Sequence, residues 1–171
     1  MALFKTILVP TDFDPNSMVA IDLARQLAVQ NGSTIHLYNV IAMPQEPPSG
    51  VVTPYKELQS AALEKLQRLA KSRLGSQVKY QVHVRVGNPE PDLVRAADKL
   101  GADLIVIATH GRGGLKRFLL GSFAEHVVRA ANCPVLVVKP NVRKAAARKT
   151  AKLSPSPAPP PSPSTAPRRA K

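Results

Sequence analysis

Short apolar runs alternate with longer polar and apolar segments along the first 140 residues. Most of these runs are rich in β-branched residues and are bounded by proline, glycine or polar residues, which is typical of strands buried on both faces. We therefore predict five strands, at residues 4–10, 33–41, 78–87, 102–109 and 134–140.

The segments between the runs repeat their apolar residues every three or four positions, as one face of a helix does. In the first segment Val19, Ala20 and Leu23 follow this spacing. Asp14 before Pro15 is a plausible cap, and Gly32 suits the end of the helix. The pattern predicts four helices, within residues 14–32, 54–75, 88–101 and 121–132.

Five strands separated by four helices predict the α/β class. The expected architecture is a doubly wound, open, five-stranded parallel sheet with helices on both faces, similar to a Rossmann fold. In such sheets ligands bind beyond the carboxyl ends of the strands, near a switch in strand order. The segments expected at that edge are residues 10–14, 40–54, 87–91 and 109–122.

Composition restricts the class of protein. Trp is absent and aromatic residues make up 4% of the chain, so the core must be aliphatic. The single Cys133 excludes an internal disulfide. No secretory leader and no apolar run of roughly 18 residues is visible, so we expect a soluble, cytoplasmic protein without a transmembrane segment.

The positive charge is concentrated at the end of the chain. Residues 1–140 hold 16 Lys and Arg against 11 Asp and Glu, whereas residues 141–171 hold 8 basic residues and no acid. We expect one domain at 1–140, followed by a disordered basic tail, rich in Pro, Ala and Ser, at 141–171. Such a tail suits non-specific binding of polyanions, either nucleic acid or anionic lipid, and a solvated tail without a partner is an equal alternative.

Residues 108–128, ATHGRGGLKRFLLGSFAEHVV, place glycines and cations after the fourth predicted strand. Their spacing fits neither a phosphate-binding Walker loop nor the GxGxxG dinucleotide loop. What remains is Gly111, nine residues, and then Gly121-Ser122 at a helix start. The amides of that helix terminus could hold an anion. Gly121 would supply backbone angles and a close approach that a side chain would block.

This spacing resembles the universal stress protein family, whose nucleotide-binding members carry G-x2-G-x9-G-[S/T] after the fourth strand. The segments ILVPTDF, GNP and ADLIVIATHGRGGLKRFLLGSFAEHVVRAANCPVLVVKP extend the resemblance over nearly all of residues 3–140. The resemblance implies a universal stress protein domain and a homodimer that pairs through the strand at 134–139. It also implies an ATP site, with or without Mg²⁺, over the carboxyl ends of strands one and four.

Site residues follow from the resemblance by position. Asp12 would meet the ribose or adenine side, Val40 would offer backbone atoms to the adenine edge, and Gly111 and the start of the fourth helix would hold phosphates. The motif's first glycine falls on Ala108. The expected nucleotide-binding set is Pro10, Thr11, Asp12, Val40, Ile107, Ala108, His110, Gly111, Arg112, Gly121, Ser122 and Phe123.

Structural explanations compete with these roles. Ser122 and Glu125 form the pattern of a capping box, which would start the helix without a ligand. A lone loop histidine such as His110 is more often solvated than catalytic. Paired-cysteine metal spacing and nucleophile motifs are absent from the sequence.

The leading hypothesis is an ATP-binding regulatory or protective module of the stress response, with at most weak ATP hydrolysis. One alternative is a weak ATPase or phosphoryl-transfer enzyme, for which only Asp12 and His110 stand where a base is needed. Another is a nucleotide-free interaction protein whose basic tail binds polyanions.

Overall fold

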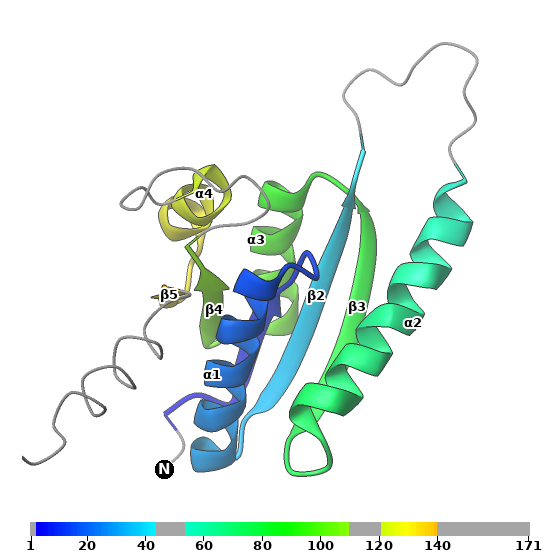
Figure 1. Cartoon of the computed structure of the whole chain (residues 1–171). Coiled ribbons are helices and arrows are strands. Elements are labelled where there is room, and N and C mark those ends of the chain that lie inside the picture. The colour runs from blue at the N-terminus through cyan, green and yellow to red at the C-terminus, as the bar shows by residue number, and fades with distance from the viewer. Residues whose placement is uncertain (1–2, 44–53, 110–120, 140–171) are drawn as a thin grey trace, which may run out of the picture. The chain divides into compact units, whose positions relative to one another are not determined.

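The structure is a computed structural model that describes residues 3–43, 54–109 and 121–139 (Figure 1). Strands and helices alternate throughout these ranges, as the hydrophobic pattern predicts. The elements are β1 (Thr6–Pro10), α1 (Pro15–Asn31), β2 (Thr34–Ala42), α2 (Tyr55–Leu74), β3 (Lys79–Gly87), α3 (Pro89–Leu100), β4 (Leu104–Ala108), α4 (Ser122–Ala130) and β5 (Val135–Val138).

The five strands form one parallel sheet in the order β3-β2-β1-β4-β5. The chain moves outward from β1 to β3, then returns to the other side of β1 with β4 and β5. The strand order therefore reverses between β1 and β4, which is where a doubly wound sheet opens a crevice at its carboxyl edge. The predicted fold class is confirmed.

The sheet is covered on both faces (Figure 1). Alternate strand residues point to opposite faces, so Ile7 and Val9 pack with α1 and α2, whereas Leu8 between them packs with α3 and α4. All three side chains are fully buried. Both core layers are mainly aliphatic, as the composition predicts.

Local signals start and end the first helix as expected. The Asp14 side chain accepts a hydrogen bond from the Asn16 amide at 2.9 Å and so caps α1. Gly32 ends it in a left-handed conformation with φ of 68°, which glycine adopts without steric cost.

The predicted capping box at the start of α4 is wrong. Gly121 occupies the N-cap position, and its carbonyl accepts the Glu125 amide at 2.9 Å. Ser122 is already the first helical residue, so its side chain is one position too late to cap the turn.

Several expectations concern residues outside the described ranges. These are the roles of His110, Gly111 and Arg112, and the nature of the tail at 141–171. Within the part of the chain that is described, no helix combines the length and apolar character needed to cross a membrane.

Candidate functional site

A cavity of about 240 Å³ opens at the carboxyl ends of β1, β2 and β4, beside the reversal of strand order. The first turns of α3 and α4 complete its wall. Its lining residues are Pro10, Thr11, Asp12, Ser17, Tyr38, Asn39, Val40, Pro89, Leu93, Ile107, Ala108, Thr109, Gly121, Phe123 and Ala124.

Most of the site residues expected from sequence meet in this cavity. Of the nine that the structure describes, eight line it: Pro10, Thr11, Asp12, Val40, Ile107, Ala108, Gly121 and Phe123. Ser122 is exposed at the first position of α4 and is not among the lining residues. Segments more than 100 positions apart in the chain thus converge on one space.

The loop after β1 is held by a network around Thr11. The Thr11 amide donates to the Tyr38 carbonyl at 2.9 Å, and the Asn39 side-chain Nδ2 donates to the Thr11 carbonyl at 2.8 Å. The Thr11 hydroxyl shares a bond of 2.8 Å with the Ser17 hydroxyl and accepts the Phe13 amide at 3.1 Å. These bonds fix the loop to β2 and to the first turn of α1.

Asp12 presents a carboxylate to the cavity from a strained turn. One carboxylate oxygen accepts the Asp14 amide at 3.0 Å, and the side chain is half-buried. Phe13 follows with φ of 64°, a left-handed conformation that is unfavourable for a bulky residue. Such strain persists where the surroundings hold it, and it concentrates at ligand sites.

Gly121 brings the start of α4 against the end of β4. Its amide donates to the Thr109 carbonyl at 2.9 Å, and an added Cβ would lie 3.0 Å from that same oxygen. Its φ of −61° is open to any residue, so the expected need for special backbone angles is wrong. The close approach to the Thr109 carbonyl is what favours glycine here.

The glycine of the GNP segment has a similar packing role at the start of α3. A Cβ on Gly87 would collide with the Asp92 carboxylate, which accepts the Asn88 amide at 2.8 Å. The carboxylate thereby holds the first turn of α3 close to the end of β3. This arrangement places Pro89 and Leu93 in the cavity wall.

Sequence reasoning missed two buried residues of β2 that line the cavity, Tyr38 and Asn39. Both are only 7% exposed. The sequence did carry a signal for them, because Tyr38 and Asn39 place a phenol and an amide near the end of an apolar run. A buried polar group at such a position needs a hydrogen-bond partner. No group of three or more His, Cys, Asp or Glu suited to a metal ion occurs within residues 3–43, 54–109 and 121–139.

The arrangement suits a flat, partly apolar ligand with an anionic end. Val40, Leu93 and Ile107 give apolar walls, and Asp12 gives a hydrogen-bond acceptor. The N-terminus of α4 supplies backbone amides that have no partner within the helix, and it carries partial positive charge.

Comparison with known proteins identifies relatives that match this chain over most of their own length. Universal stress protein MJ0531 of Methanocaldococcus jannaschii is 35% identical over 144 residues, which is 80% of this chain and 83% of the relative. Universal stress protein G of Escherichia coli O157:H7 is 34% identical over 144 residues, covering 80% of this chain and all of that protein.

Solved structures agree in fold. The structure of the hypothetical protein MJ0577 is 30% identical with a TM-score of 0.60, covering 80% of this chain and 96% of that one. A universal stress protein solved in complex with cAMP is 28% identical with a TM-score of 0.58, covering 80% and 97%. Residues 3–139 match the universal stress protein family. The chain therefore belongs to the universal stress protein family.

Proposed function

We propose that this protein binds an adenine nucleotide, ATP in the first instance, in the cavity at the carboxyl ends of β1 and β4. The observation that carries the proposal is the convergence of eight expected nucleotide-binding residues on that one cavity. The cAMP complex of a relative supports adenine as the base. Nucleotide binding would favour one arrangement of the loops around the cavity and so regulate partners in a stress response.

The residues assign a role to each part of the nucleotide. Val40 offers its backbone to the adenine edge, and the Asp12 carboxylate accepts from ribose hydroxyls. A volume of about 240 Å³ lies below the roughly 300–1,000 Å³ of most ligand pockets, so it suits base and sugar alone. The phosphates would extend toward the amides at the start of α4.

Mg²⁺ would be bound chiefly through the phosphates. Asp12 is the only carboxylate among the described lining residues, and one of its oxygens already accepts the Asp14 amide. Mg²⁺ commonly uses one or two carboxylates together with substrate phosphates and water, which this site can satisfy.

Binding rather than catalysis is the function these lining residues support. Asp12 and Tyr38 are the only ionisable side chains among them in the described ranges. We assign the Asp12 carboxylate to the ribose hydroxyls, which leaves ATP hydrolysis without an evident base among the described lining residues. Slow hydrolysis remains the enzymatic alternative, and phosphate release from bound ATP measures it directly.

We also propose a two-fold dimer through β5. This strand is at one edge of the sheet, where it pairs with β4. Leu136 on β5 is 37% exposed and Val128 on the adjoining α4 is 45% exposed. An apolar edge strand invites pairing with a second copy.

The deciding experiment is equilibrium binding of ATP, ADP, AMP and cAMP to the purified full chain by calorimetry. Gly121→Val should weaken ATP binding by at least about tenfold, because the side chain would displace the start of α4 from Thr109. Ala130→Val, at the exposed far end of the same helix, is the matched control. Unchanged ATP affinity in a Gly121→Val protein with native circular dichroism would rule out this site.

A further inference from the structure

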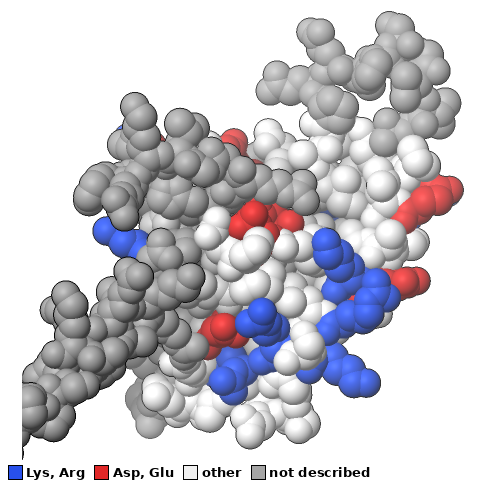
Figure 2. Space-filling model, in the orientation of Figure 1, with Lys and Arg blue, Asp and Glu red and all other residues white. Residues whose placement is uncertain are grey.

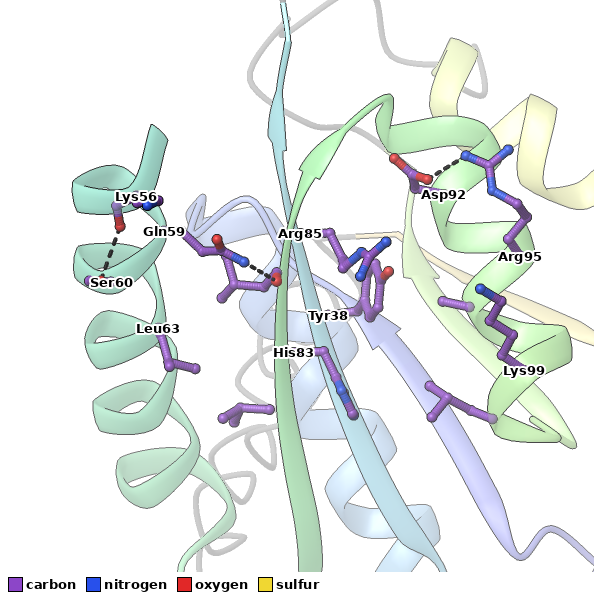
Figure 3. Close-up of a pocket in the computed structure, with 14 residues that line it drawn as sticks. Tyr38, Lys56, Gln59, Ser60, Leu63, His83, Arg85, Asp92, Arg95 and Lys99 are labelled. Carbon is purple, nitrogen blue, oxygen red and sulfur yellow. Dashed lines mark hydrogen bonds and ion pairs between the residues drawn. The ribbon is translucent and has the colours of Figure 1, made fainter. Parts of the chain in front are cut away.

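A second hollow lies beside the edge strand β3, on the side that α3 only partly covers (Figure 3). About 700 Å³ of open space surrounds this strand. Val82 and Val84 face the α2 layer, whereas His83 and Arg85 face the α3 layer, because neighbouring strand residues point in opposite directions. The strand therefore divides the space in two, and the hollow is the part on the α3 side.

Three cations and one carboxylate surround this hollow. Arg85 projects from β3, and Arg95 and Lys99 project from α3 (Figure 3). Arg95 pairs with Asp92, whose carboxylate also accepts the Asn88 amide. Among the described residues, neither Arg85 nor Lys99 forms an ion pair. The hollow therefore keeps a surplus of positive charge.

A buried phenol without a partner lies at the centre of these charges. Tyr38 is 7% exposed, and its hydroxyl has no hydrogen-bond partner within the described part of the chain. Its hydroxyl end lies toward the Arg85 guanidinium (Figure 3). Burial raises the pKa of Tyr38, while Arg85 lowers it, Asp92 raises it and Arg95 lowers it, and all four residues line the same hollow. The hydroxyl is thus a protonated donor in a cationic setting.

The floor of the hollow is neutral and partly apolar. Ala96 and Leu100 of α3 form one side, and the His83 ring lies with its centroid 5.9 Å from that of Tyr38. Burial lowers the pKa of His83, so the imidazole is uncharged at neutral pH. The positive charge therefore comes from the arginines and the lysine.

We propose that this hollow is a binding site for the phosphate group of a small phosphorylated ligand, separate from the nucleotide cavity. The Tyr38 hydroxyl and the Arg85 and Arg95 guanidiniums would donate hydrogen bonds to the phosphate oxygens, with Lys99 adding charge. Guanidinium groups match tetrahedral phosphate by paired, charge-assisted hydrogen bonds. The phosphate would supply the acceptor that the Tyr38 hydroxyl lacks among the described residues.

The two sites share Tyr38 and otherwise use different residues. Pro89 and Leu93 of α3 face the nucleotide cavity, whereas Asp92, Arg95 and Lys99 line the hollow. Tyr38 borders both. The proposal therefore stands or falls independently of ATP binding.

A second basic surface lies on α2, outside the hollow. Figure 2 shows Lys and Arg gathered over α2, whose second half carries Lys65, Arg68, Lys71 and Arg73. Arg68 is exposed there and pairs with Glu64 at 3.4 Å. Arg68→Gln removes the same charge as Arg85→Gln on a surface outside the hollow, so it is the matched control.

The test titrates the full chain with inorganic phosphate and, separately, with ribose 5-phosphate at low ionic strength, followed by amide shifts in NMR. We expect saturable binding with the largest shifts around Arg85 and Arg95. Arg85→Gln and Tyr38→Phe should each weaken it about tenfold, and Arg68→Gln should change it less than twofold. If ribose 5-phosphate binds more tightly than inorganic phosphate, the ligand is a phosphorylated metabolite. If the two bind equally, the ligand is free phosphate.

Three outcomes would overturn the proposal. One is no saturable binding of either probe to the folded protein. Another is equal weakening by Arg68→Gln and Arg85→Gln, which would indicate general charge attraction. The third is a loss of phosphate binding in Gly121→Val while Arg85→Gln still binds phosphate normally, which would place the phosphate in the nucleotide cavity. ATP affinity, measured on the same variants, tests the nucleotide site separately.

Discussion

Acidification should destabilise the folded protein through a pair of histidines between β2 and β3. His36 Nδ1 and His83 Nε2 are 3.0 Å apart, and the two rings stack with centroids 5.2 Å apart. Burial lowers the pKa of both groups, and the charge of His83 lowers that of His36 further. One nitrogen must donate and the other accept, so the accepting ring must stay neutral and the bond is lost when both rings are protonated.

The sign and size of the effect follow from proton linkage. In the unfolded chain both histidines titrate near 6.5, whereas in the folded protein they titrate lower. As the pH falls through 6.5, the unfolded state takes up protons that the folded state does not. The free energy of unfolding then falls by up to about 1.4 kcal/mol per pH unit for each histidine.

Urea unfolding at about pH 7.5, 6.5 and 5.5, at fixed ionic strength, measures this slope. Stability should be nearly constant above 6.5 and fall below it. His83→Gln should reduce the slope by about half, because one titrating group remains. His126→Gln, on the exposed side of α4, is the control. Equal slopes for His83→Gln and the unmodified protein, or a stability that rises on acidification, would refute the reasoning.

Three further predictions concern a buried hydrogen bond, the edge strand β5 and the basic tail. Asn39→Ala removes the buried donor to the loop after β1, so we expect a loss of about 1–3 kcal/mol in urea unfolding and weaker ATP binding. Val137→Lys places a charge on the β5 edge and should shift a dimer toward monomer in light scattering. A concentration-independent monomer mass for the unmodified chain would contradict the proposed dimer. Deletion of residues 141–171 should lower DNA and RNA binding at low salt and leave ATP affinity intact. A full chain that binds no polyanion at low salt would exclude that role for the tail.

The sequence predicted the order of elements well because helix and strand periods are local properties. The ends of strands were less predictable, since they depend on distant partners. The Asp103 carboxylate accepts the amides of Lys5 and Thr6 at 2.7 and 2.9 Å. This contact joins the start of β1 to the turn before β4, and no local pattern at either position indicates it.

The candidate site was predictable where a spaced motif marked it and not where burial decided it. The glycine spacing brought Gly121 into consideration and the family resemblance brought Asp12 and Val40, and all three line one cavity. Tyr38 and Asn39 read as members of an apolar strand, and their roles depend on which loop and helix pack against them. The Ser122 capping box was wrong because the bond from Gly121 to Thr109 fixes where α4 begins.

The turn that presents Asp12 is a place where stability and ligand binding oppose each other. A left-handed backbone at Phe13 costs about 1–3 kcal/mol, and glycine would relieve it. The ring, however, packs against the α1–α2 layer, and Lys65 Nζ lies 4.2 Å from its centroid. Around it, the Thr11 network holds the loop on both sides. The ring packing and the Thr11 network together hold the strained turn, which leaves the Asp12 carboxylate fixed in position before any ligand arrives, so that less ordering is needed on binding.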